Sequence, residues 1–333
     1  MRYEFFSDNT AGIAPEAAAA LMRANQGYAP SYGADSWSER AADQLRALFD
    51  CDAQVFFTST GTAANALALA ALCPPHQAVL CHRQAHVFGD EAGAPIFFGN
   101  GLAVTPIATD DWKICPEGVR TALESGIASN MHIAALSLAN ASELGALYTN
   151  AELEAIGAVT GGGSLGFHID GARLANAVAA GLDPKRLVRA HIDVVAVGGA
   201  KAGMAGGEAL VFLTPRLAHQ FETRLKQTGQ LAAKARFSSA QWVALLESGA
   251  WLSRAAHANR MAALLAGAAP FPCVYPVSTN VVFLDMTPAQ YARLGELGWA
   301  ALRYGNGAVR FMCSWATTEA DIDELAMVLQ QLV

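Results

Sequence analysis

Val194-Val195-Ala196-Val197-Gly198-Gly199-Ala200-Lys201-Ala202-Gly203 is an apolar run that leads through two glycines to a lysine. The chain contains five lysines, and only Lys201 directly follows a strand-like run amid glycines and alanines. A lysine in such a position loses hydration, which lowers the pKa of its amine and frees it as a nucleophile. A solvated loop lysine is the alternative interpretation, so the surrounding sequence has to distinguish the two.

Short apolar runs of this kind alternate with helical patterns from about residue 50 to residue 215. The alternation is typical of βαβ units, and it predicts an α/β fold with a mainly parallel sheet. Thr149 and Glu152 have the spacing of a capping box, which predicts a helix over residues 149–159. The predicted strands cover residues 54–58, 78–81, 102–107, 132–138, 167–170, 194–198 and 209–213.

The pattern changes after about residue 240. A helical stretch leads to predicted strands over residues 279–285 and 308–313, and a closing helix follows, which Thr318 and Asp321 can cap. We therefore expect a large domain with an N-terminal arm over residues 1–240, and a small α+β domain over residues 241–333. The apolar residues at helical spacing in the closing helix are Ile322, Leu325, Leu329 and Leu332.

The composition is that of a soluble protein with little charge. Charged residues make up 15% of the 333 residues and hydrophobic residues 53%, whereas roughly 25% of an average soluble protein is charged. Such a chain is expected to bury surface against copies of itself, as a homodimer or homotetramer. The N-terminus has no apolar h-region and no run of about 18 apolar residues follows, which predicts a cytoplasmic protein without a membrane partner.

Charge and cysteine spacing argue against further classes of protein. The formal charge is −7 and there is no basic run, which argues against a nucleic-acid partner and favours a small-molecule substrate. The six cysteines are scattered without Cys-x-x-Cys spacing. This argues against a disulfide framework and a cysteine-rich metal site, so we expect reduced thiols and no metal.

Gly161-x-Gly163-x-x-Gly166 matches the dinucleotide-binding expression. That fingerprint must follow a strand and open a helix, so that the helix N-terminus meets the pyrophosphate. Here the glycines precede a predicted strand. We interpret them as a loop, which disfavours a nicotinamide oxidoreductase.

Thr58-Ser59-Thr60-Gly61-Thr62-Ala63-Ala64-Asn65 follows a predicted strand and precedes an alanine- and leucine-rich helix. Small residues let backbone amides and hydroxyls approach a phosphate, and the helix dipole favours the anion. The segment is therefore a candidate phosphate-binding turn. An ordinary helix N-cap is the alternative.

Phe167-His168-Ile169-Asp170-Gly171-Ala172-Arg173 places His168 and Asp170 on one side of a predicted strand whose other side is apolar. An acid at a strand end beside a glycine turn suits an interior site that faces a cationic group. A structural pair between Asp170 and an arginine is the alternative.

Two further residues could take part in such a site. His86 lies just beyond a predicted strand and could stack on a cofactor ring, although a structural histidine is equally simple. Arg310 lies on an apolar strand of the predicted small domain, where its burial requires an anionic partner. A substrate carboxylate or a protein acid would serve.

A phosphate-type turn, an acid at a strand end and a lysine 31 residues later (201 − 170) resemble the pattern of fold-type I enzymes that use pyridoxal 5'-phosphate (PLP). The order of the motifs is similar to that of the low-specificity threonine aldolases, and the likeness covers almost the entire chain. The motifs are Ser7-Asp8-Asn9, Tyr32-Gly33, residues 60–65, the His86 segment, His168-x-Asp170-Gly171-Ala172-Arg173 and Gly199-Ala200-Lys201.

The resemblance implies that PLP is the cofactor and that Lys201 binds it as a Schiff base. Asp170 would pair with the pyridine nitrogen, and His86 would stack on the ring. The base would be His86 or a bound water. Gly61 and Thr62 would hold the phosphate. These five residues are the centre of the implied site.

The resemblance also implies a substrate-binding set. Ser7, Arg173 and Arg310 would orient the substrate carboxylate, with Arg173 close to the cofactor as well. Arg236 would reach the phosphate of a neighbouring subunit, so the site would lie near a subunit interface. A solvated helix arginine is the alternative for Arg236.

The implied activity is cleavage of a β-hydroxy-α-amino acid of the threonine, allo-threonine or phenylserine type to glycine and an aldehyde. Ala200 and Ala202 flank Lys201 where the family usually has polar residues or glycine. Asn140-Ala141-Ser142-Glu143-Leu144-Gly145 stands where many members have Asn-Thr-His-Asn-Gly, so the family histidine has no direct counterpart. A β-eliminating PLP lyase and a catalytically silent protein of the same fold are the alternatives.

Overall fold

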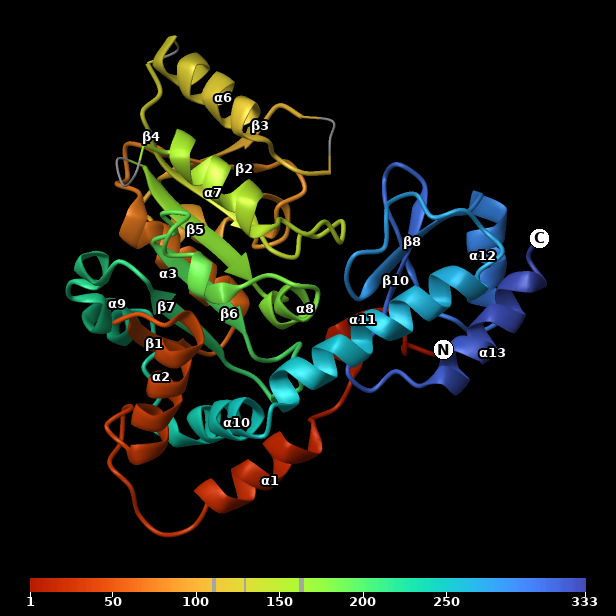
Figure 1. Cartoon of the computed structure of the whole chain (residues 1–333), viewed down its shortest axis with the longest axis horizontal. Helices are drawn as coiled ribbons and strands as arrows, with labels where there is room; N and C mark the ends of the chain where they lie inside the picture. The colour runs from red at the N-terminus through yellow and green to blue at the C-terminus, as the bar shows by residue number, and fades with distance from the viewer. Residues whose placement is uncertain (110–111, 129, 162–164) are drawn as a thin grey trace.

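A computed structural model describes residues 1–109, 112–128, 130–161 and 165–333 (Figure 1). Its larger sheet has seven strands in the order β1-β7-β6-β5-β4-β2-β3. Strands β3, β2, β4, β5 and β6 are parallel, and β7 runs antiparallel to both β6 and β1. The predicted α/β fold with a mainly parallel sheet is confirmed.

The strands lie close to their predicted positions. The runs at 54–58 and 194–198 have the predicted bounds, and the other five in this sheet differ by one or two residues at their ends. The strands are β1 (Gln54–Thr58), β2 (Ala78–His82), β3 (Ala103–Ile107), β4 (Ile133–Ala139), β5 (Gly166–Gly171), β6 (Val194–Gly198) and β7 (Glu208–Phe212).

Helices cover both faces of this sheet (Figure 1). Thr149 and Glu152 form the predicted capping box at the start of α7. The helices up to residue 227 are α1 (Pro15–Ala24), α2 (Ser36–Phe49), α3 (Gly61–Leu72), α4 (His86–Gly89), α5 (Ala94–Phe98), α6 (Pro116–Ala128), α7 (Asn150–Val159), α8 (Leu174–Ala179) and α9 (Phe221–Gln227).

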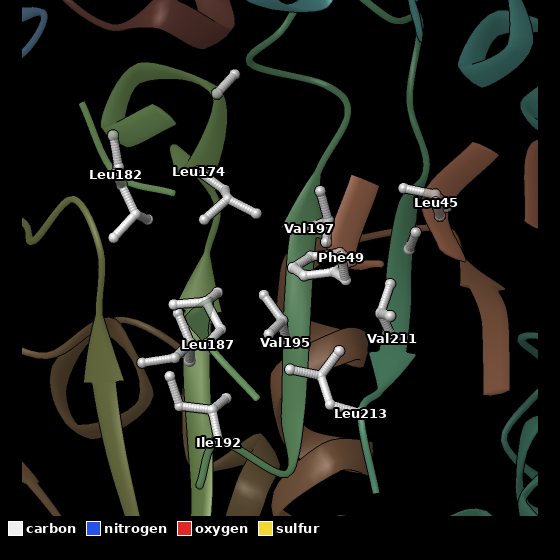
Figure 2. Close-up of a cluster of buried hydrophobic side chains, with 14 of the residues drawn as sticks. Leu45, Phe49, Leu174, Leu182, Leu187, Ile192, Val195, Val197, Val211 and Leu213 are labelled. Atoms are coloured by element: carbon white, nitrogen blue, oxygen red, sulfur yellow. The ribbon is translucent and has the colours of Figure 1, made fainter. Parts of the chain in front are cut away.

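The packing of strand β6 on both faces explains why apolar and polar residues do not alternate in its sequence. Val195 and Val197 pack with Phe49 of α2 in one buried cluster (Figure 2), whereas Val194 and Ala196 belong to a second cluster beneath α3. A parallel strand covered on both faces needs apolar side chains at every position. All five residues of β6 are buried.

A three-stranded antiparallel sheet lies at the other end of the molecule (Figure 1), in the order β8-β10-β9. Thr318 and Asp321 form the predicted capping box at the start of the closing helix, whose Ile322, Leu325 and Leu329 are buried. The elements of this region are β8 (Val281–Asp285), α12 (Pro288–Glu296), β9 (Leu302–Arg303), β10 (Ala308–Met312) and α13 (Glu319–Gln330).

Two helices connect the sheets. Helix α10 (Arg236–Glu247) packs on α1 and α2, and α11 (Ala250–Ala268) packs on α8 at one end and on α13 at the other. The predicted domain boundary at residue 240 falls within α10 and stays a prediction.

The glycine motif precedes a strand, as expected. Gly161 follows α7, and Gly166 is the first residue of β5. Gly163 lies outside the described residues. Since no helix begins directly after these glycines, the described part of the motif lacks the context for dinucleotide binding.

Candidate active site

The carboxyl ends of β4, β5 and β6 meet at one edge of the large sheet, because the three strands are parallel and neighbouring. Ala139 pairs with Asp170, and Asp170 pairs with Ala196. Lys201 follows β6 by three residues, and the antiparallel β7 begins at the same edge with Glu208 opposite Gly198. The sheet topology thus gathers an acid, a lysine and a second acid.

The turn that carries Lys201 is fixed by glycines and by Glu208. A Cβ at Gly198 would collide with the carbonyl oxygen of Ala172, so the close approach requires glycine. The Glu208 carboxylate accepts a hydrogen bond from the Gly199 N–H at 2.6 Å. These contacts set the direction in which the lysine side chain leaves the sheet.

The surroundings of Lys201 lower the pKa of its amine. Burial lowers the pKa of Lys201, and the charge of Arg173 lowers it further, while the surrounding carboxylates oppose both effects. Burial also raises the pKa of Glu208 to about 7. A lysine with a lowered pKa has more of its amine in the nucleophilic form.

Asp170 is buried and is bonded to an amide side chain rather than to an arginine. Its Oδ2 accepts a hydrogen bond from Asn65 Nδ2 at 2.9 Å, and its Oδ1 accepts one from the Ala172 N–H at 3.0 Å. Asn65 lies on α3 and is itself buried. Among the described residues, Asp170 therefore has no direct salt bridge to an arginine.

A hydrogen-bonded chain continues from Asn65 to His86. Glu91 Oε1 accepts from Asn65 Nδ2 at 2.8 Å and lies 2.9 Å from His86 Nδ1. The hydrogen bond to Glu91 raises the pKa of His86, and burial raises the pKa of Glu91. The Glu91 side chain is fully buried, whereas that of His86 is 40% exposed, so the histidine is the accessible end of the chain.

Arg173 is held by an aspartate from the N-terminal segment. Its Nε and Nη2 donate to the two carboxylate oxygens of Asp8 at 2.7 and 3.0 Å, and Asn280 Nδ2 also donates to Asp8. Burial alone would raise the pKa of Asp8, but the charges of Arg173 and Lys201 outweigh it and hold that pKa below its ordinary value. Asp8 therefore lies in the field of both cations.

The N-terminus of α3 has open space in front of it. Thr60 caps the helix by accepting from the Ala63 N–H at 3.1 Å. Gly61 and Thr62 are half-buried, and a Cβ at Gly61 would meet no atom within 4 Å. The ordinary N-cap is present, and it leaves the first backbone N–H groups available to an anion.

Arg310 reaches from the small sheet to the segment that contains Ser7. Its Nη2 donates to the Phe6 carbonyl at 3.1 Å and its Nη1 to the Tyr304 hydroxyl at 3.3 Å. Its buried Nε has no hydrogen-bond partner, and within the described ranges no acid pairs with this guanidinium. The Ser7 hydroxyl accepts from the Asn9 N–H and caps a short 3₁₀ helix, η1 (Asp8–Thr10).

Arg236 lies apart from this group, at the start of α10. Its guanidinium lies 5.2 Å from the Phe237 ring centroid, and its buried Nε has no partner. A cavity of about 530 Å³ near this helix is lined by Ser59 of the phosphate-type turn and by Gly207 of the loop after Lys201.

The sequence did not predict a role for four acids that surround the candidate residues. Asp8 and Glu208 lie near Lys201, Glu91 bonds to His86, and the Glu143 carboxylate accepts from the His86 backbone N–H at 2.6 Å. Asp8 and Glu143 stood inside quoted motifs, but their partners lie far away in sequence. Only the fold brings them to the site.

This fold, with a lysine turn and an acid at neighbouring carboxyl ends of the sheet, defines a fold-type I α/β protein. The model of the β-eliminating lyase family matches residues 4–289. The chain belongs to this family.

Characterised relatives are similar over nearly the whole length. The low specificity L-threonine aldolase of Pseudomonas sp. (strain NCIMB 10558) is 46% identical over 97% of this chain and 96% of its own. The protein of the same name from Pseudomonas aeruginosa is 45% identical with the same coverage. A solved structure of Leishmania major threonine aldolase superposes with a TM-score of 0.92 at 29% identity, over 99% of both chains.

The described part of the chain has neither a candidate metal centre nor a candidate membrane span. Within it, no group of three or more His, Cys, Asp or Glu residues is arranged to hold a metal ion. No helix there has the length and apolarity needed to cross a membrane. All six cysteines are free.

Proposed function

We propose that this chain is a PLP-dependent carbon–carbon lyase that cleaves β-hydroxy-α-amino acids of the threonine type to glycine and an aldehyde. The observation that carries the proposal is the half-buried Lys201, whose amine lies in the electric field of Asp170 and of the Asp8–Arg173 pair. The sequence identity of 46% to a low specificity L-threonine aldolase supports the same reaction class.

The residues at the site fit PLP. Lys201 would attach to the carbonyl carbon of the cofactor, and Asp170 would pair with the pyridine nitrogen. Gly61 and Thr62 would bind the phosphate at the α3 N-terminus, where the structure has open space. His86 would lie against the ring. When bound to an amino acid, PLP supplies an electron sink for the bond that breaks at Cα.

The charged residues suit an amino-acid substrate. Arg310 has a buried guanidinium nitrogen without a partner, so a substrate carboxylate would complete its hydrogen bonds. Ser7 follows the Phe6 carbonyl that positions this arginine. Arg173 uses Nε and Nη2 for its hydrogen bonds to Asp8. We propose that its remaining guanidinium nitrogen faces the substrate carboxylate.

The hydrogen bonds that Asp170 accepts support its proposed role beside the pyridine nitrogen. Asn65 donates to Asp170, and among the described residues no arginine forms a direct salt bridge with this carboxylate. A carboxylate in this state favours a protonated partner nitrogen. Asp170 would therefore keep the pyridine nitrogen charged, which strengthens electron withdrawal from the substrate.

We also propose a homodimer or homotetramer with the site near a subunit interface. Exposed aromatic and aliphatic side chains support this, among them Tyr28, Phe88 and Phe97. Arg236, whose Nε has no hydrogen-bond partner, would reach the phosphate of a second copy. We propose the cytoplasm as the location and a division near residue 240 as the domain boundary. The proposed partner is a small molecule, the amino-acid substrate.

An absorbance scan and a product assay test the function. The purified holoenzyme should be yellow, lose that colour with borohydride, and form glycine and aldehyde in equal amounts from L-threonine or L-allo-threonine. Lys201→Ala should lack the borohydride-reducible link. Ammonia and a keto acid as the products would instead identify a β-eliminating lyase, and no turnover would indicate a silent protein of this fold.

A further inference from the structure

Glu143 is a carboxyl group at the proposed site to which the proposed mechanism gives no role. Its loop follows β4, and the Asn140 N–H donates to the Asp170 carbonyl at 2.9 Å. The loop therefore leaves the sheet directly beside the acid of the site. Glu143 Oε1 accepts a hydrogen bond from the His86 backbone N–H at 2.6 Å.

The Glu143 turn is fixed on both sides. The Ser142 N–H donates to the Ala146 carbonyl and the Ala146 N–H donates to the Ser142 hydroxyl, which closes the turn. Gly145 has a φ of +78°, and a Cβ there would collide with Val281 of β8. The small sheet thus holds this turn in place.

Glu143 has no cation bonded to it within the described residues. Its hydrogen bonds come from backbone N–H groups, its own and that of His86. The charged and titratable groups that act on it or feel its charge are Asp170, His86, Arg173, Tyr148 and Cys81.

Burial and the charge of Asp170 raise the pKa of Glu143 to about 7. A general base is most effective when its pKa lies near the operating pH. His86 is less suited to that task, because its Nδ1 is bonded to Glu91 and its ring is assigned to the cofactor.

We propose that Glu143 is the catalytic base that removes the proton from the β-hydroxyl of the substrate. The inference rests on the proposed aldolase function. Glu143 would take the place of the histidine that many family members have in this loop.

The proton and electron balance is simple. The hydroxyl O–H bond breaks, its proton goes to a Glu143 carboxylate oxygen, and its electron pair forms the aldehyde carbonyl. The Cα–Cβ bond breaks and leaves its electron pair at Cα. One proton is then added at Cα to give glycine, and Glu143 releases one proton, so no oxidant or reductant is required.

The test compares wild-type holoenzyme with Glu143→Gln. Glutamine keeps the size of the side chain and an oxygen for the His86 N–H, but it cannot take the proton. We expect kcat for threonine cleavage to fall by about 10²–10⁴-fold, with KM changed only a few-fold. The wild-type rate should fall as the pH drops below about 7, because Glu143 then becomes protonated. The residual activity of Glu143→Gln should not show this fall.

A partial reaction separates catalysis from folding. Exchange of the glycine α-proton in D₂O involves no β-hydroxyl, so Glu143→Gln should retain its rate within a few-fold. A control variant, Glu154→Gln, changes the same side chain in a half-exposed pair with Arg186, and both reactions should persist. In cofactor-free protein, ¹³C NMR should detect a carboxyl that titrates near pH 7 and is missing from Glu143→Gln.

Unchanged cleavage by Glu143→Gln would overturn the inference. An equal loss of cleavage and exchange would also overturn it, because Glu143 would then act by holding His86. Wild-type enzyme that exchanges glycine protons but cleaves neither threonine diastereomer would refute the proposed function, and with it the role of Glu143. These results differ from one another.

Discussion

His86 and Glu91 show how one buried acid can set the state of an exposed histidine. Glu91 Oε1 lies 2.9 Å from His86 Nδ1, so the carboxylate favours the proton on that nitrogen. Asn65 donates to both Glu91 and Asp170, which joins the two acids through one amide.

The residue-scale prediction concerns Glu91→Gln. The neutral amide removes the charge that favours protonated imidazole, so the pKa of His86 and its NMR titration midpoint should fall. Cofactor-free protein is the suitable sample, because no other ring then contacts the histidine. A midpoint that stays in place would show that Glu91 does not control this imidazole, and Glu154→Gln serves as the unchanged control.

At the scale of elements, the turn between β6 and β7 carries the reactive lysine and depends on glycine. Replacing Gly198 by alanine would drive a Cβ into the Ala172 carbonyl oxygen. We expect a loss of roughly 1–3 kcal/mol in the free energy of unfolding, because the strands must separate to admit the methyl group. Urea unfolding measures it.

Gly295→Ala on α12 is the matched control, since a Cβ there meets no atom within 4 Å. Alanine is the better helix former, so this variant should be neutral or more stable by up to about 1 kcal/mol. Equal losses in both variants would contradict the argument from close approach.

Elements that depend on local signals could be predicted from the sequence. Strand β6 followed from an apolar run, and α7 and α13 began at capping boxes, all within a few neighbouring residues. The site contacts could not be predicted in this way. Arg173 bonds to Asp8 across 165 positions, and Asn65 to Asp170 across 105, so their pairing exists only in the folded chain.

At the scale of the whole molecule, the candidate site combines three parts of the chain. The N-terminal segment supplies Asp8, the large sheet supplies Asp170 and Lys201, and the small sheet sends Arg310 to the Phe6 carbonyl. The two sheets are therefore linked through charged groups at the site. Changes in the ionisation of these groups should affect the stability of the entire fold.

Glu208 offers the clearest case of that linkage. Burial raises its pKa in the folded protein to about 7, against an ordinary value of 4.5. The folded state therefore binds the proton more tightly than the unfolded state. Its contribution to stability is full below about pH 4.5 and is lost as the pH rises to about 7.

Glu208→Gln should therefore gain stability relative to wild type as the pH rises. Glutamine keeps an oxygen for the Gly199 N–H and never ionises, so the difference in unfolding free energy should move in favour of the variant by up to about 3 kcal/mol between pH 4.5 and pH 8. Urea unfolding of the cofactor-free proteins at both pH values measures it. Glu154→Gln should show little change with pH, because its exposed ion pair contributes little. A constant difference for Glu208→Gln would mean that the Glu208 carboxyl ionises equally well in the folded and unfolded chains, and that the Lys201 turn stabilises its negative charge.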